Sequence, residues 1–221
     1  MVSALDWNPS FRVISSRYPT VSVYDRIASA SEFAAVLELE ALTNPRVREE
    51  AGDFRKLRAE DALTGPGSTP VMASFAYSGP SRFCDGSYGV YYAAHDELTA
   101  IAESRYWTER FLRATNEPSI DVDKRLYTAR IRGTFDDIRE RSARNALYAK
   151  DDYSRSQAYA RELYERNKVD GIVYRSVRRE EGECTCVFRP RNITGARMAA
   201  YLQFRWDGAS IVSVARLTEI A

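Results

Sequence analysis

The sequence predicts one α+β domain, in which helices pack against a mixed, largely antiparallel sheet. Residues 197–206 and 209–217 each alternate apolar and polar side chains, and the Asp-Gly pair between them is the strongest short-range signal for a β-hairpin. The short aromatic run at 90–93 is typical of a buried strand, and a helical pattern follows it directly. No internal repeat or low-complexity linker interrupts the chain, so residues 1–221 are expected to form a single domain.

The composition limits the kinds of partner and site. Hydrophobic residues make up 44% of the 221 residues, which is enough for a core. The 32 basic and 31 acidic residues nearly cancel, so the charge gives no reason to expect a nucleic-acid partner. His95 is the only histidine, which excludes multi-histidine metal sites, and no metal is expected.

Cysteine usage and hydropathy indicate the compartment. The odd set Cys84, Cys184 and Cys186 is poorly spaced for a framework of disulfides, which favours the reducing cytoplasm. The N-terminus lacks a signal-peptide pattern, and no apolar run approaches membrane-spanning length. A cytoplasmic protein without a membrane partner is therefore expected.

The N-terminal third is predicted to contain one strand and a helical insertion. Residues 1–20 are expected to be irregular because Pro9 and Pro19 interrupt them. The segment 21–27 alternates like a strand. Two charged amphipathic helices are expected within 29–65, the second starting at Asn44-Pro45 and the pair ending at Gly65.

The remaining pattern alternates between strands and helices. Ala158, Leu163 and Tyr159 are expected to face inward from the last helix. The predicted elements are an extended segment at 71–77, a helix at 96–116 capped by Asp96, a strand at 124–132, a turn with a short helix within 136–148, a helix at 153–167, and an antiparallel strand pair at 172–176 and 183–188.

The stretch from residue 82 to residue 103 has the most specific pattern. Tyr92 lies near the end of the aromatic strand, and Glu103 lies about two turns into the following helix. A carboxylate on the core-facing side of a helix is unfavourable unless another group pairs with it. A strand-turn-helix unit would bring the phenol of Tyr92 and this carboxylate to one edge of the sheet.

This stretch resembles the RES-domain toxins of bacterial RES–Xre toxin–antitoxin pairs. An aromatic strand, a short turn and Thr-Ala-x-x-Glu occur in that family, in which a tyrosine precedes the glutamate by the same interval as here. The resemblance extends from Tyr24 to the C-terminus, but Ser81 and Cys84 stand where the family usually has glycine and asparagine, which leaves the geometry of the phosphate loop open. The other matching segments are Tyr24-Asp25-Arg26-Ile27, Arg82-Phe83, Gly171 to Ser176, and the hairpin at Gln203 to Gly208.

The resemblance implies an ADP-ribosyltransferase-like fold, NAD as the substrate and no further cofactor. Cleavage of the nicotinamide–ribose bond passes through an oxocarbenium-like state, which Glu103 would stabilise. Arg26 and Arg82 would bind the pyrophosphate through charge-assisted hydrogen bonds. Tyr92 would offer its ring to the nicotinamide or its hydroxyl to orient the substrate, and Ser176 would bond the ribose or position the glutamate.

Three functions remain open from the sequence. The first is a toxin that cleaves NAD as a glycohydrolase or a phosphorylase, held inactive by a cognate Xre-type antitoxin, a partner that the resemblance implies. The second is an ADP-ribosyltransferase that modifies a protein or a small molecule. The third is a non-catalytic interaction protein whose helical region 29–63 binds a partner. The identity of the acceptor, and whether the chain forms a homo-oligomer, also remain open.

Overall fold

The structure is a computed structural model that describes residues 1–16, 61–76, 79–142 and 145–218. Its elements in chain order are β1 (Val2–Ser15), α3 (Ser68–Ala76), β2 (Tyr91–Ala94), α4 (Glu97–Ala114), β3 (Ile120–Asp137), η4 (Ala146–Tyr148), α5 (Ser154–Arg166), β4 (Gly171–Arg175), β5 (Glu183–Val187), η5 (Pro190–Asn192), β6 (Ile193–Trp206) and β7 (Ile211–Leu217).

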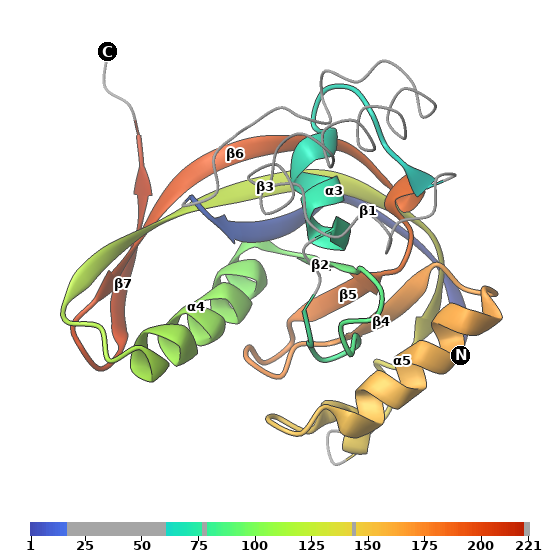
Figure 1. The fold of residues 1–221 in the computed structure, drawn as a ribbon. Helices are drawn as coiled ribbons and strands as arrows, with labels where there is room; N and C mark the ends of the chain where they lie inside the picture. Colours follow the sequence, from blue (N-terminus) through green and yellow to red (C-terminus); the bar gives the residue numbers. More distant parts are fainter. Residues whose placement is uncertain (17–60, 77–78, 143–144, 219–221) are drawn as a thin grey trace, which may run out of the picture.

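The strands form one seven-stranded sheet in the order β1-β2-β5-β4-β3-β6-β7. The pairing of β3 with β4 is parallel, and the other strand pairings among the described residues are antiparallel. Because β1 also pairs with β3, the strands β1, β2, β5, β4 and β3 close into a ring. Helices α4 and α5 lie below the curved sheet in Figure 1, and α3 contacts the strands β2 and β6, so the α+β prediction is confirmed.

The N-terminal segment is a long strand, so the prediction of irregular structure at 1–20 was wrong. The strand β1 pairs with β3 from Val2 opposite Asp136 to Ser15 opposite Lys124. The register shifts between Trp7 and Ser10, and Pro9 falls in this irregularity, where a missing backbone N–H interrupts no ladder bond. The predicted strand at 21–27 lies outside the described residues, as does most of the predicted insertion at 29–65.

The apolar segment predicted to be extended at 71–77 is instead the end of helix α3. Val71, Met72 and Phe75 are all buried. Phe75 packs in the same cluster as Tyr91 of β2 and Ile131 of β3. A short helix that is apolar on several sides shows no clear period, so its sequence cannot be distinguished from that of a buried strand.

The strand-turn-helix unit at the centre of the sequence is present as predicted. Helix α4 begins after Asp96, whose Oδ1 accepts a hydrogen bond of 2.9 Å from the backbone N–H of Thr99. This bond satisfies one of the free N–H groups at the helix start. Strand β2 ends at Ala94, so only two residues separate it from the helix.

The C-terminal half also follows the predicted pattern. The strand predicted at 124–132 is extended at both ends to form β3, and the pair β4–β5 is antiparallel as expected. Helix α5 buries Ala160, with Tyr159 and Leu163 half-buried, whereas Ala158 is exposed, so its inward placement was wrong. The hairpin of β6 and β7 is confirmed.

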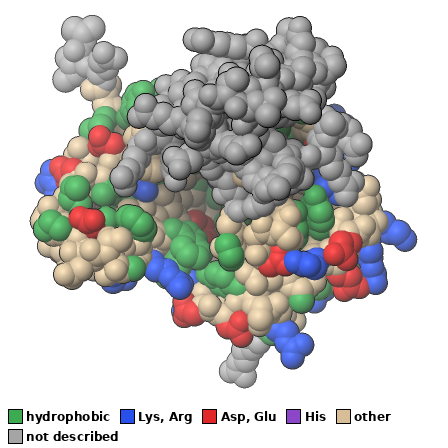
Figure 2. Space-filling model, viewed as in Figure 1, with side chains coloured by type: hydrophobic (Ala, Val, Ile, Leu, Met, Phe, Trp, Pro, Cys, Tyr) green, Lys and Arg blue, Asp and Glu red, His purple; other side chains and the backbone are tan. Residues whose placement is uncertain are grey.

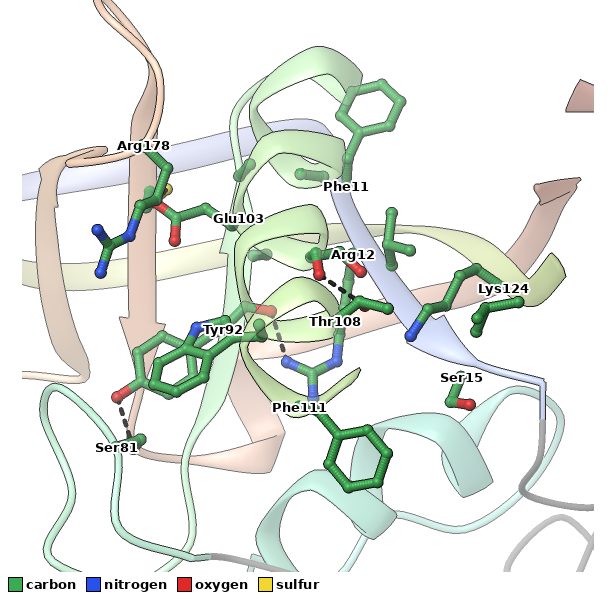
Figure 3. Close-up of a pocket in the computed structure, with 18 of the residues that line it drawn as sticks. Phe11, Arg12, Ser15, Ser81, Tyr92, Glu103, Thr108, Phe111, Lys124 and Arg178 are labelled. Atoms are coloured by element: carbon green, nitrogen blue, oxygen red, sulfur yellow. Dashed lines mark hydrogen bonds between the residues drawn. The ribbon is translucent and has the colours of Figure 1, made fainter. Parts of the chain in front are cut away.

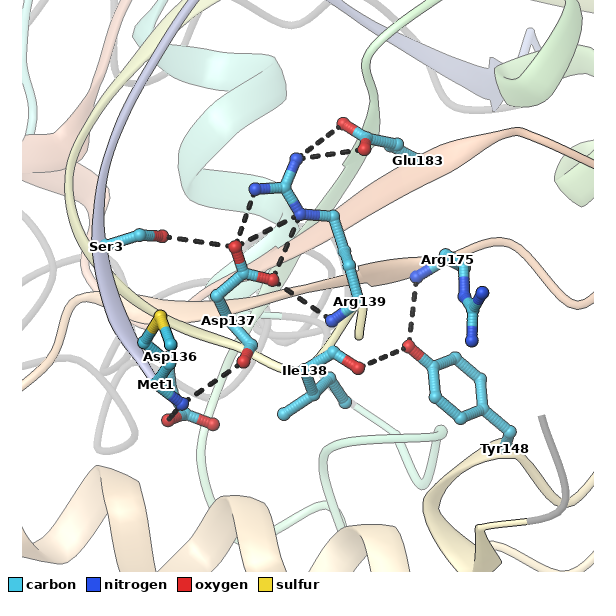
Figure 4. A network of polar contacts seen from close by, with 9 residues as sticks. All are labelled: Met1, Ser3, Asp136, Asp137, Ile138, Arg139, Tyr148, Arg175 and Glu183. Carbon is cyan, nitrogen blue, oxygen red and sulfur yellow. Dashed lines mark hydrogen bonds and ion pairs between the residues drawn. The ribbon is translucent and has the colours of Figure 1, made fainter. Parts of the chain in front are cut away.

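A polar network fixes the strand ends near the start of the loop that follows β4 (Figure 4). Arg139 donates hydrogen bonds of 2.9 Å to both carboxylate oxygens of Glu183 and also binds the carboxylate of Asp137. The Tyr148 hydroxyl donates to the Ile138 carbonyl and accepts from the backbone N–H of Arg175. The last residue of β4 is thereby held next to the end of β3. None of the described helices is long and apolar enough to cross a membrane.

Candidate active site

A cavity of about 870 Å³ lies between helix α4 and the strands β1, β2 and β3. This volume is within the range of small-molecule sites. Figure 2 shows apolar side chains gathered around a hollow near the centre of this face. Figure 3 shows the side chains that line the cavity, which come from several elements far apart in the sequence.

Glu103 lines this cavity from helix α4, and Ser176 orients its carboxylate. The Ser176 Oγ donates a hydrogen bond of 2.6 Å to the Oε1 of Glu103. The same Oγ accepts the backbone N–H groups of Arg178 and Arg179 at 3.0 and 3.1 Å. Because the two amides occupy the lone pairs of the hydroxyl, its single proton is directed at the carboxylate.

Tyr92 lines the cavity from β2, and its hydroxyl is engaged by the protein. The hydroxyl accepts the backbone N–H of Phe83 at 2.9 Å and lies 2.9 Å from the Ser81 Oγ (Figure 3). Burial raises the pKa of Tyr92 well above its ordinary value, so the phenol is neutral. The hydroxyl holds the 81–84 loop, and the part of Tyr92 left for a ligand is its ring.

Arg82 lines the same cavity, and part of its guanidinium binds backbone. Its Nη1 donates to the carbonyls of Leu147 and Ala149 at 3.1 and 2.8 Å. The guanidinium also lies over the Tyr153 ring, 4.7 Å from the centroid. The structure therefore brings Arg82, Tyr92, Glu103 and Ser176 to one site, while the fifth predicted position, Arg26, lies outside the described residues.

Arg12 of β1 is a cavity residue that the sequence did not indicate. Its Nη1 donates a hydrogen bond of 2.7 Å to the Tyr92 carbonyl, and its guanidinium lies 4.6 Å from the Tyr91 ring centroid. The Nε is buried and has no hydrogen-bond partner in the described part of the chain, and burial lowers the pKa of Arg12. The available signal was a charged residue between apolar neighbours in Phe11-Arg12-Val13, which is informative only once this segment is recognised as a strand.

Arg178 is a second cation that the sequence did not indicate, and it lies near Glu103 in Figure 3. Its guanidinium lies 3.3 Å from the centroid of the Tyr106 ring, and its Nη2 donates to the Lys150 carbonyl. Within the described ranges, no group of three or more His, Cys, Asp or Glu side chains is arranged to hold a metal. The site can thus present one oriented carboxylate together with several cations and aromatic rings.

Comparison with known proteins places the chain in a family. The model of the RES domain matches residues 54–207, which is more than half of the chain. The protein belongs to the RES domain family. The matched range contains Arg82, Tyr92, Glu103 and Ser176, whereas Arg12 precedes it.

Two further similarities were found for this RES-domain protein. It is 29% identical over 207 residues to the uncharacterized protein y4oC of Sinorhizobium fredii (strain NBRC 101917 / NGR234), and the match covers 91% of this chain and 84% of y4oC. A crystal structure of the M. tuberculosis MbcT–MbcA toxin–antitoxin complex is similar with a TM-score of 0.44 and 12% identity, covering 93% of this chain and 88% of that chain. These values are too low to support an argument about activity.

Proposed function

We propose that this RES-domain protein is an enzyme that consumes NAD by cleaving its nicotinamide–ribose bond. The observation that supports this most directly is the position of the Glu103 carboxylate. It lines a cavity of about 870 Å³ and accepts a hydrogen bond of 2.6 Å from the Ser176 hydroxyl. A fixed carboxylate beside a sugar carbon is the arrangement used to stabilise an oxocarbenium-like transition state.

The reaction requires little else from the protein. When the C1′–N bond breaks, its electron pair moves to the pyridinium nitrogen, so nicotinamide leaves as a neutral molecule and needs no general acid. The positive charge that develops on the ribose is stabilised by Glu103, and water or phosphate then attacks C1′. None of the described residues that line the cavity is a histidine, which is consistent with a cleavage step that needs no general acid.

The remaining cavity groups fit the other parts of a dinucleotide. Arg12 and Arg82 would bind the pyrophosphate, because guanidinium groups form charge-assisted hydrogen bonds with phosphate oxygens. Tyr92, Trp107 and Tyr153 line the cavity and offer ring surfaces for a base. The cations would thus hold the substrate while the carboxylate acts at the ribose.

We further infer that the protein is the toxin of a toxin–antitoxin pair and acts in the cytoplasm. Loss of NAD would be harmful to the cell that makes the enzyme, and the motifs shared with RES–Xre toxins point to an Xre-type antitoxin as its partner. The three cysteines all lie among the described residues, are buried and form no disulfide with one another, as suits a reducing compartment. Growth arrest on expression, relieved by co-expression of a helix-turn-helix protein encoded beside this chain, would support this inference, and normal growth on expression would contradict it.

The enzymatic proposal is tested by incubating the purified full chain with NAD and measuring nicotinamide by chromatography. The Glu103→Gln variant keeps the shape of the side chain and removes its charge, so we expect kcat to fall roughly 100- to 1,000-fold. Glu162→Gln, on the exposed face of α5, is the matched control and should retain wild-type activity.

Full activity in Glu103→Gln would contradict the proposal. Product identification separates the alternatives, because hydrolysis gives ADP-ribose and phosphorolysis gives its 1″-phosphate. Nicotinamide release that depends strictly on an added acceptor would instead identify an ADP-ribosyltransferase.

A further inference from the structure

Lys124 of β3 lines the same cavity, although neither the sequence motifs nor the proposed cleavage step uses it. Lys124 is 9% exposed. Figure 3 shows its amine pointing into the cavity, on the opposite side of α4 from Glu103 in this view. The backbone here is held on both sides, because Lys124 pairs with Ser15 of β1 and with Leu202 of β6. The position of the ammonium group is thus set by the sheet.

Within the part of the chain that the structure describes, the ammonium of Lys124 has no hydrogen bond or ion pair. Its Nζ lies 5.8 Å from the centroid of the Phe204 ring. Asp121 and Asp123 also line the cavity, but they alternate with Lys124 along β3, so their carboxylates lie on the other face of the strand. There, Asp121 pairs with Arg205, and Asp123 accepts a hydrogen bond from Gln203.

A buried charge without a partner is unfavourable, and the pKa of Lys124 reflects this. Burial lowers the pKa of Lys124 to about 8, from an ordinary value of 10.5. The protein thus keeps a desolvated cation in a cavity where an apolar side chain of similar length would be more stable. A negatively charged ligand bound in the cavity would compensate the buried positive charge of Lys124.

Two further unpartnered groups line the same cavity. The Oγ of Ser16 and the Nε of Arg12 are buried and have no hydrogen-bond partner among the residues that the structure describes. All three groups can donate a hydrogen bond, and a set of unsatisfied donors with a positive charge is suited to bind an anion.

We propose that Lys124 forms an anion subsite that binds a phosphate group during NAD cleavage. The proposal rests on the proposed function for the identity of the reaction but not for the existence of the subsite. Phosphate fits because it offers several acceptor oxygens to a compact ammonium group. The phosphate belongs either to the dinucleotide or to free phosphate, an oxygen of which attacks C1′ as nicotinamide leaves with the bonding pair.

Direct binding tests the subsite without catalysis. Isothermal titration calorimetry of the full chain with ADP-ribose and with inorganic phosphate should show that Lys124→Met weakens the binding of at least one probe about 10- to 100-fold, the amount expected for a charged hydrogen bond. Lys168→Met removes the same charge from an exposed position that does not line the cavity, and should leave both dissociation constants within about twofold.

The kinetics of the same variant identify the source of the phosphate. A raised KM for NAD in the absence of added phosphate assigns the subsite to the dinucleotide, whereas loss of only the phosphate-dependent rate assigns it to the free ion. Unchanged binding of both probes by folded Lys124→Met overturns the proposal. A melting temperature of this variant below that of the wild type also overturns it, because the ammonium would then have a structural partner. Inactivity of the wild type on NAD would refute the proposed function but not a phosphate site that depends on Lys124.

Discussion

At the scale of single residues, the direction of the Glu103 carboxylate depends on one hydroxyl group. Ser176 is the first residue after β4, and its Oγ connects two backbone amides of the next loop to the carboxylate. Ser176 therefore acts through Glu103 as a positioning residue. From the sequence, Ser176 was expected either to bond the ribose or to position Glu103, and the fold shows a contact between the two side chains across 73 positions.

Removing this hydroxyl should impair turnover more than substrate binding. In Ser176→Ala, the carboxylate keeps its charge and loses its orientation, so we expect kcat to fall roughly 10- to 100-fold while KM for NAD changes little. Steady-state kinetics of nicotinamide release measure both constants. Ser176→Thr retains a hydroxyl and should recover much of the activity, whereas a purely structural role would change the melting temperature without this division between kcat and KM.

The other cavity residues differ in how far the sequence revealed them. Arg82 and Tyr92 lie in a local pattern and were found from it. Arg12 and Lys124 are single cations in strands, and each becomes informative only when the strand pairing shows that it enters a cavity. Arg178 likewise depends on how a loop folds back toward α4, which no local pattern specifies.

At the scale of elements, the loop at 81–84 depends on strand β2. The Tyr92 hydroxyl accepts the N–H of Phe83, a residue with no exposed surface, so the strand end and the loop form one unit. Arg82 lies within this loop and reaches the backbone of η4 and the residue after it. Three segments that line or support the cavity are connected in this way.

Deleting that hydroxyl should loosen the whole unit. Tyr92→Phe leaves a buried N–H without an acceptor, so we expect the free energy of unfolding to fall by about 1–3 kcal/mol. Urea denaturation measures this change, and Tyr201→Phe on the exposed face of β6 serves as the control. Equal stability of the Tyr92→Phe variant and the wild type would show that water replaces the phenol at the Phe83 amide.

The elements that the sequence predicted correctly are those whose local signals agree. Helix α4 has a cap and an amphipathic pattern, and the β6–β7 hairpin has an Asp-Gly turn. Strand β1 was missed because Pro9 usually marks irregular structure and because the strand that accommodates it, β3, lies more than a hundred residues away. Helix α3 was assigned as extended because its burial removes the polar positions that reveal a helical period.

At the scale of the whole molecule, Lys124 lowers global stability in a way that depends on pH. The folded protein has a pKa of about 8 at this residue, below the ordinary 10.5. Between these two values the unfolded chain binds more protons at this position than the folded one, so the contribution of Lys124 to stability becomes more favourable as the pH rises. Below pH 8 the full destabilisation is present.

Lys124→Met should therefore be more stable than the wild type at pH 7, by up to about 3 kcal/mol, and the advantage should shrink by pH 10. Urea unfolding of both proteins at several pH values gives this difference. A difference that stays constant with pH would show that Lys124 is not desolvated in the fold. The other charged groups of the cavity are present in both proteins and cancel in the comparison: Arg12, Arg82, Glu103, Glu117, Asp121, Asp123 and Arg178.

The ring of strands has a consequence for when activity can begin. During synthesis, Glu103 leaves the ribosome well before Ser176. The strand β1 can form its ladder with β3 only after β3 has been synthesised. In the nascent chain, the Glu103 carboxylate is therefore not yet oriented by Ser176, and the cavity that Arg12 lines has not yet formed. The proposed NAD cleavage could therefore start only after translation is nearly finished, which leaves time for the proposed antitoxin to be made first.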